Sequence, residues 1–234
     1  MAPTCRGYAP SPLQNAGGGA FGRDLFSVLA RDCLAIVDGI APGCRFDVVG
    51  HDIGGFTVYH LLRIAPERVR RAVTMSAGHP AAVFSNIRRM PGQIWRSRYA
   101  FLFRVPGLSE WYVRQNAFAY VESLWRRWAA PGWEAPKEHL AEVKRTLAAS
   151  MPWPLLHYRA GAFSRRGRWP PIRTPTLHLA GALDGCLLPE AVAGQERYFS
   201  GPFRSELIQN AGHFLHLEQP KIVNGEIVRW LAAT

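Results

Sequence analysis

The chain has 234 residues, of which 48% are hydrophobic and 19% are charged, and this balance excludes an intrinsically disordered protein. The formal net charge is +11, but only three of the 28 basic residues are lysines, the arginines are scattered, and no recognition motif accompanies them, so we expect no nucleic-acid partner. There is no apolar run of the roughly 18 residues that a membrane helix needs, no hydrophobic signal core near the start, and no zinc-ligand spacing among the four cysteines, so we expect a cytoplasmic protein without a membrane partner or a metal.

The first predicted elements form one supersecondary unit. Residues 23–38 have the apolar spacing of an amphipathic helix, and residues 46–49 form a short β-prone strand. The strand leads directly into a glycine-rich turn, a helix from about 56 to 65 and a second strand at 69–75. Strand, tight turn, helix and strand in this order predict a βαβ unit with two parallel strands.

The middle of the chain has a different composition. Residues 80–174 contain seven of the eight tryptophans, many arginines and several proline breaks, and no β-rich run. We therefore predict that this stretch is a mostly helical insertion, or lid, in an α/β core made of residues 1–79 and 175–234.

The βαβ pattern returns after the insertion. We predict strands at 176–180 and 205–208, a helix near 189–198, and a C-terminal helix at about 220–231. The predicted fold class is therefore α/β, with a mostly parallel sheet and helices on both faces.

The turn after the first strand has the spacing of a nucleophile elbow. A nucleophile on a sharp strand-to-helix turn needs small residues two before and two after it, and Gly50-x-Asp52-x-Gly54 provides them. The following helix N-terminus favours negative charge on Asp52 and on an oxyanion beside it. The alternative is that Asp52 is an ordinary N-cap after a glycine turn.

Two further residues follow later strands and could complete a catalytic triad. Asp184 follows the strand 176–180, and His213 follows the strand 205–208. The order nucleophile, acid, histidine is that of α/β-hydrolases, and open α/β sheets carry their sites at the carboxyl ends of strands. Alternatively, Asp184 is a turn residue and His213 a loop histidine. His51 and His216 are weaker candidates for the base.

Several segments resemble epoxide hydrolases and haloalkane dehalogenases. Residues 49–55, VGHDIGG, are similar to their nucleophile motif, and residues 212–220, GHFLHLEQP, are similar to their catalytic-histidine segment. The stretches around Tyr99 and Tyr158 resemble those that carry the two lid tyrosines of epoxide hydrolases. Residues 6–11, RGYAPS, resemble the RGYGxS loop that precedes the helix before the elbow.

This resemblance implies an α/β-hydrolase fold and a two-step reaction. Asp52 would displace the leaving group and form an alkyl-enzyme ester. His213, oriented by Asp184, would then activate the water that hydrolyses the ester. The backbone N–H of Ile53 would contribute to the oxyanion hole.

Tyr99 and Tyr158 help to distinguish epoxide hydrolysis from dehalogenation. They would donate hydrogen bonds to the epoxide oxygen, although both could instead be packing residues of the lid. A dehalogenase commonly has a halide-binding tryptophan immediately after the nucleophile, where this chain has Ile53. We therefore favour hydrolysis of a small apolar epoxide over dehalogenation, and the resemblance implies no organic cofactor.

The sequence departs from the family before the elbow. The family has several strands ahead of the RGYGxS loop and an HGxP loop that supplies half of the oxyanion hole, and neither is found here; His79-Pro80 lacks the intervening glycine. We therefore expect an N-terminally short fold in which the strand 46–49 is a free edge that could pair with a second copy. The alternative function is a non-catalytic relic or a ligand-binding module.

Overall fold

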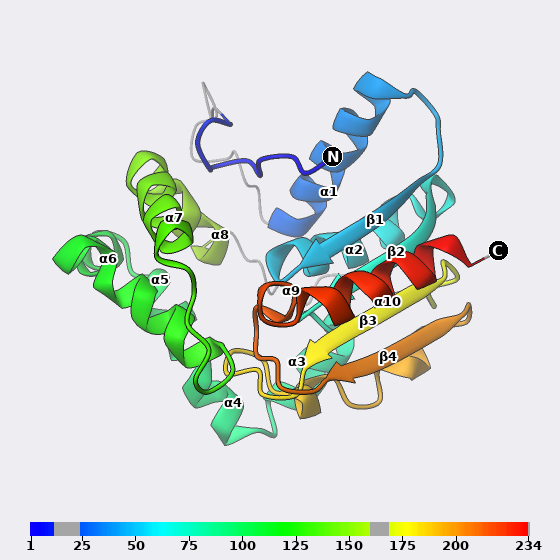
Figure 1. The fold of residues 1–234 in the computed structure, drawn as a ribbon. Helices are drawn as coiled ribbons and strands as arrows, with labels where there is room; N and C mark the ends of the chain where they lie inside the picture. Colours follow the sequence, from blue (N-terminus) through cyan, green and yellow to red (C-terminus); the bar gives the residue numbers. More distant parts are fainter. Residues whose placement is uncertain (12–23, 160–168, 234) are drawn as a thin grey trace.

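A parallel four-stranded sheet forms the centre of the fold (Figure 1). The computed structural model describes residues 1–11, 24–159 and 169–233. The strands lie in the order β1-β2-β3-β4, and all three neighbouring pairs are parallel. Their bounds are β1 Phe46–His51, β2 Val69–Met75, β3 Thr176–Gly181 and β4 Phe203–Ile208. The predicted α/β class with a mostly parallel sheet is confirmed.

The helices are α1 Leu25–Ile40, α2 Ile53–Ile64, α3 Pro80–Ile87, α4 Pro91–Arg96, α5 Arg98–Phe103, α6 Leu108–Trp128, α7 Lys137–Ser150, α8 Trp153–Arg159, α9 Leu215–Glu218 and α10 Pro220–Ala232. Short 3-10 helices span η1 Pro66–Arg68, η2 Pro189–Val192 and η3 Gln195–Tyr198. Residues 115–118 leave helical geometry, so α6 is two helices joined at a kink. None of the helices in the described ranges is both long and apolar enough to cross a membrane.

Helices cover both faces of the sheet because successive side chains of a strand point to opposite faces. On one face, α2 packs Val58 and Leu61 in the same buried cluster as Ala72 of β2. On the other face, the adjacent Val73 of β2 packs in a cluster with Val223 of α10. Burying apolar surface on both faces stabilises the fold by about 25 cal/mol per Å² of area removed from water.

Helices α3 to α8 follow β2 and lie beyond the carboxyl ends of the strands (Figure 1). Their own apolar cluster includes Phe103, Val113, Leu124 and Leu155. No strand interrupts residues 80–159, in agreement with the predicted helical content, and residues 160–168 of the predicted insertion lie outside the described part. We refer to Pro80–Arg159 as the α3–α8 segment.

Several predicted element boundaries differ from those in the structure. The predicted helix near 189–198 is wrong: η2 and η3 are two short turns, separated at Gly194 by a left-handed backbone with φ of 73°. Helix α2 begins directly after Asp52 rather than near residue 56, and α1 runs through Gly39 to Ile40. The predicted start of α1 at residue 23 lies outside the described residues.

Strand β1 lies at one edge of the sheet. Within the described ranges it pairs with β2 only. All six residues of β3 are buried, whereas Gly50 alone is buried in β1 and Val49 is 42% exposed. The outer edge of β1 therefore has no strand partner among the described residues, and apolar side chains lie beside it.

Candidate active site

The connection between β1 and α2 is a sharp turn at Asp52. Asp52 has a φ of 50°, in the left-handed region that non-glycine residues rarely occupy, and its backbone N–H donates to the carbonyl of Met75 at 3.0 Å. Its carboxylate makes no capping hydrogen bond to α2, so it does not act as an ordinary N-cap. The carboxylate is instead presented to the space above the sheet.

Close backbone contacts explain two of the glycines around this turn. A Cβ on Gly50 would lie 2.3 Å from the carbonyl oxygen of Gly54, and a Cβ on Gly55 would lie 2.5 Å from the Cβ of Ala77. A Cβ on Gly54 would meet nothing within 4 Å. The expected need for a small residue two positions after Asp52 is therefore wrong: the tight position is Gly55, because Gly54 faces open space.

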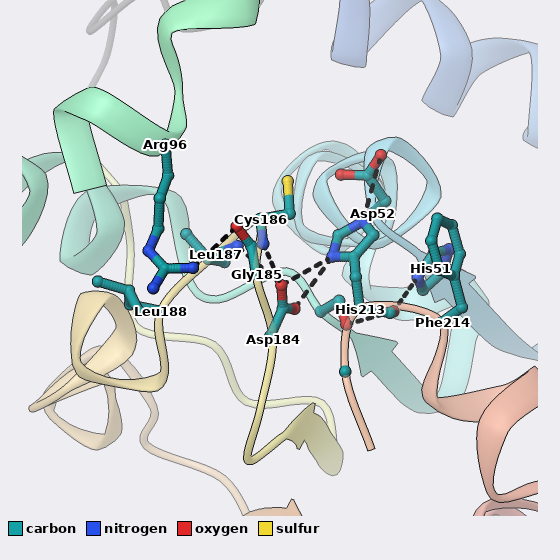
Figure 2. Close-up of polar contacts among 12 residues, drawn as sticks. His51, Asp52, Arg96, Asp184, Gly185, Cys186, Leu187, Leu188, His213 and Phe214 are labelled. Carbon is teal, nitrogen blue, oxygen red and sulfur yellow. Dashed lines mark hydrogen bonds and ion pairs between the residues drawn. The ribbon is translucent and has the colours of Figure 1, made fainter. Parts of the chain in front are cut away.

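Asp52, His213 and Asp184 lie in a row at the carboxyl ends of the strands (Figure 2). His213 Nε2 is 3.9 Å from Asp52 Oδ2, and His213 Nδ1 is 3.0 Å from Asp184 Oδ2. Because a carboxylate can only accept, Nδ1–H donates to Asp184. The side chains of His213 and Asp184 are 1% exposed, whereas that of Asp52 is 36% exposed.

Asp184 is held by the loop that it begins. Its Oδ1 accepts hydrogen bonds from the backbone N–H groups of Cys186 at 2.7 Å and Leu187 at 2.9 Å. Asp184 is thus both a turn residue and the partner of His213, so the two interpretations of this residue are compatible. Fixing the carboxylate in this way fixes the imidazole that it contacts.

The backbone of His213 is anchored on both sides. Its N–H donates to the carbonyl of Trp128 at 2.9 Å. Its carbonyl accepts from His51 Nε2 at 2.8 Å and from Ser76 Oγ at 2.9 Å. His51 ends β1 and Ser76 directly follows β2, so the carboxyl ends of these two neighbouring strands and the end of α6 together position the imidazole.

Nearby charges and burial shift the pKa values of His213 and Asp52 in opposite directions. Burial would lower the pKa of His213, but the negative charge and hydrogen bond of Asp184, together with Asp52, raise it well above the ordinary value. Burial would raise the pKa of Asp52, but His213, His51 and the backbone of Ile53 hold it below the ordinary value. Asp52 is therefore ionised at neutral pH, as a nucleophile must be.

A cavity of about 420 Å³ lies over Asp52. Tyr99 of α5 and Tyr158 of α8 line it together with Asp52 and Ile53. The other lining side chains are largely apolar, among them Leu25, Phe26, Phe56, Val83, Phe84, Ile87 and Phe101. The volume suits a small organic molecule.

The two tyrosines that line this cavity pack against each other edge to face. Their ring centroids are 5.9 Å apart, and Tyr158 packs against Phe103 at 4.9 Å. Burial raises the pKa of both phenols well above the ordinary value, so both remain hydrogen-bond donors at neutral pH. Tyr99 Oη lies 3.4 Å from Cys186 Sγ, a contact that no sequence motif predicts.

Within the described ranges, no group of three or more His, Cys, Asp or Glu side chains is arranged to hold a metal ion. The cavity lining nevertheless has polar members besides Asp52 and the two tyrosines: Ser76, Arg88, Gln93, Ser97, Arg104, His157 and Cys186.

The family match and the relatives of this chain agree with each other. Residues 1–226 match the alpha/beta hydrolase family. The chain is 28% identical over 211 residues to epoxide hydrolase 3 of Xenopus tropicalis and 26% identical over 209 residues to epoxide hydrolase 4 of Mus musculus. These alignments cover 86% and 87% of this chain but only 56% and 58% of the relatives, so the chain spans little more than half of their length.

A solved structure supports the same fold. The epoxide hydrolase of Bacillus megaterium in complex with an inhibitor superposes with a TM-score of 0.82 at 20% identity. The superposition covers 98% of this chain and 82% of that one.

Proposed function

The chain belongs to the alpha/beta hydrolase family, and on that basis we propose that it hydrolyses small apolar epoxides to vicinal diols through an ester on Asp52. The observation that carries this proposal is the position of an ionised, cavity-facing carboxylate 3.9 Å from a buried histidine and beside two protonated tyrosines. The epoxide-hydrolase names of the relatives support it.

In the first step, a carboxylate oxygen of Asp52 attacks an epoxide carbon. A carbon–oxygen bond forms to Asp52, the ring carbon–oxygen bond breaks, and its electron pair goes to the epoxide oxygen. Tyr99 and Tyr158, whose rings line the same cavity, donate hydrogen bonds to that oxygen and lower the barrier to ring opening. The α3–α8 segment acts as the lid that provides both phenols.

In the second step, the charge of Asp52 helps to determine the pKa of His213. While Asp52 is ionised, it is one of the groups that raise the pKa of His213. Esterification removes this negative charge, so the pKa of His213 falls and the imidazole can accept a proton from water. The resulting hydroxide attacks the carbonyl carbon of the ester, and the Ile53 N–H stabilises the oxyanion. Collapse breaks the bond between the acyl carbon and the diol oxygen, and that alkoxide takes the proton that His213 removed from water. The epoxide oxygen takes its proton from a tyrosine, which regains one when the Asp52 carboxylic acid, now containing an oxygen from water, ionises again.

Ile53 also bears on the choice between epoxides and haloalkanes. A leaving halide needs a strong hydrogen-bond cradle, and Ile53 offers only its backbone N–H, whereas the paired phenols match a developing alkoxide. We therefore favour the epoxide as substrate.

We also make proposals on the cellular location and the partners of the protein. We propose a cytoplasmic location because the four cysteines are all free, as a reducing compartment would keep them. We propose no nucleic-acid partner, because the basic residues follow no recognition motif.

The test uses the wild type, the double variant Tyr99→Phe/Tyr158→Phe, and His213→Gln, with styrene oxide and 1-chlorohexane as substrates. We expect the wild type to form the diol and the double variant to lose at least about 10²-fold in kcat. In His213→Gln, intact-protein mass spectrometry should find the enzyme heavier by one epoxide molecule. Turnover of the chloroalkane alone would favour a dehalogenase, and neither turnover nor ester would favour a binding module.

A further inference from the structure

A second cavity, of about 450 Å³, shares Tyr99 with the cavity over Asp52. Tyr99, Trp128 and Gly185 are shared between its wall and the surroundings of the catalytic groups. Trp128 packs against Tyr99 at 4.9 Å and against His213 at 5.3 Å between ring centroids. The remaining wall includes Trp95, Tyr120 and three arginines.

The three arginines are Arg96, Arg98 and Arg127, and none of them has a carboxylate partner among the described residues. Arg96 Nη1 donates to the carbonyl of Gly185 at 3.1 Å, which holds its guanidinium at the cavity wall (Figure 2). Arg98 lies over the ring of Trp95, with its Cζ 4.4 Å from the ring centroid. By contrast, Arg126 is 3.7 Å from Glu122 and does not line the cavity.

Each of these guanidinium groups has N–H donors left after its internal contacts. Arg127 Nε donates to the Ser123 carbonyl at 3.1 Å, and Arg98 Nη1 donates to the Trp95 carbonyl at 2.9 Å. A guanidinium has five N–H donors in a planar fork that matches a carboxylate. Three positive groups around one hollow therefore favour an anion, and hydrogen bonds to that anion would be charge-assisted.

The aromatic walls indicate what the anion is attached to. Trp95, Tyr120 and Trp128 offer ring surfaces for stacking, and the volume lies in the range of small-molecule sites. We propose that this cavity binds a small organic carboxylate with an aromatic body, independently of the epoxide site. The proposal does not depend on the catalytic activity, because it concerns a different cavity and its test measures binding.

The occupant would touch elements that position the catalytic groups. The carbonyl of Trp128 accepts from the N–H groups of both His213 at 2.9 Å and Gly185 at 3.1 Å. Gly185 directly follows Asp184, and Arg96 holds its carbonyl. A carboxylate that binds the remaining N–H groups of Arg96 would contact the residue that holds the Gly185 carbonyl, so the ligand is placed to alter turnover without occupying the epoxide site.

The test is a titration with phenylacetate, followed by tryptophan fluorescence, because Trp95 and Trp128 line the cavity. Calorimetry gives the stoichiometry. We expect one site with a Kd of about 1 mM or tighter, and at least about tenfold weaker binding by neutral 2-phenylethanol. The triple variant Arg96→Gln/Arg98→Gln/Arg127→Gln should also weaken binding at least about tenfold.

Two control variants separate this site from general charge and from the epoxide cavity. Arg126→Gln removes a neighbouring charge outside the cavity, and Arg88→Gln/Arg104→Gln removes the two arginines that line the epoxide cavity. Both should bind phenylacetate within about twofold of the wild type. Equal loss in a control, equal binding of the alcohol, or no saturable binding would overturn the proposal. Circular dichroism of each variant excludes unfolding as the cause.

Discussion

At the scale of single residues, the carbonyl of His213 is the least obvious part of the site. It accepts two side-chain hydrogen bonds, from His51 and Ser76, while the N–H of the same residue is bound by Trp128. A buried imidazole between two carboxylates must keep one orientation to serve both, and a displacement of about 1 Å can cost up to about 10²-fold in rate. We infer that His51 is a positioning residue.

His51→Ala should therefore lower kcat about tenfold with little change in KM. His51→Gln, whose amide can still donate, should recover much of the loss. The matched control is His216→Ala: its ring lies 4.5 Å from that of His51, but no hydrogen bond joins it to the His213 carbonyl. Equal losses in His51→Ala and His216→Ala would mean that packing, rather than the hydrogen bond, is what matters.

The sequence indicated Asp52, Asp184 and His213 as triad candidates, because each follows a strand in the chain order of a triad. The structure brings all three together, and it places Tyr99 and Tyr158 on the cavity over Asp52. Ser76 and Trp128 could not be predicted in this way. Ser76 acts on a backbone carbonyl and Trp128 acts through its own, so neither contact requires a motif.

At the scale of elements, the elbow depends on two close approaches, at Gly50 and at Gly55, and sequence spacing identified only the first of them. Gly50→Ala would place a Cβ 2.3 Å from the Gly54 carbonyl, in a turn with no room to relax. We expect a loss of at least about 2 kcal/mol in the free energy of unfolding. Gly54→Ala, in the first turn of α2 with nothing within 4 Å, should instead stabilise by about 0.5–1 kcal/mol.

Urea unfolding of both variants checks this contrast. Destabilisation by Gly54→Ala comparable to that of Gly50→Ala would contradict the geometry of the turn.

Two ion pairs join helices within the described α3–α8 segment: Lys144 of α7 pairs with Glu122 of α6, and Arg159 pairs with Glu110. Arg159 Nη1 lies 2.8 Å from Glu110 Oε1, and this contact joins the end of α8 to the first turn of α6. The hydrogen bond from Arg159 lowers the pKa of Glu110 from 4.5 to about 2. Because the folded pKa is depressed, the stabilisation is present above pH 4.5 and is lost as the pH falls toward 2.

Glu110→Gln should therefore cost about 1 kcal/mol at pH 7, and the difference from the wild type should shrink below pH 4.5. Glu142→Gln is the control, since Glu142 and its partner Arg145 are 61% and 68% exposed and such pairs contribute little. A difference between wild type and Glu110→Gln that stays constant from pH 7 to pH 3 would show that the ion pair is not its source.

Most elements could be predicted because their apolar periodicity is strong, and β2 was predicted with its observed bounds. The failure at 189–198 has a local cause. Gly194 adopts a left-handed backbone between η2 and η3, and this breaks a stretch whose apolar residues otherwise suit a helix.

At the scale of the whole molecule, β4 forms one edge of the sheet in the described ranges and β1 forms the other. The strand is apolar, and an unpaired apolar edge favours pairing with another strand. We propose that two copies associate through it. The sequence anticipated this edge only through the strand order of the family that it resembles, because periodicity within a strand does not reveal its neighbours.

Light scattering across a concentration series tests this association. The wild type should show a dimer fraction that grows with concentration, and Val49→Lys should remain monomeric because a charge on the edge opposes pairing. Val228→Lys changes a 64% exposed valine of α10 and should behave as the wild type. A wild type that stays monomeric at every concentration would rule out this association.

The most direct test of the whole account is a single turnover in ¹⁸O-labelled water with enzyme in excess of styrene oxide. Trypsin then releases residues 46–63, between Arg45 and Arg63, and fragmentation distinguishes Asp52 from Asp47 in that peptide. An ester route predicts ¹⁸O in the Asp52 carboxylate and an unlabelled diol. Label in the diol with none in Asp52 would mean that water attacks the epoxide directly, and it would contradict the role of Asp52 as nucleophile.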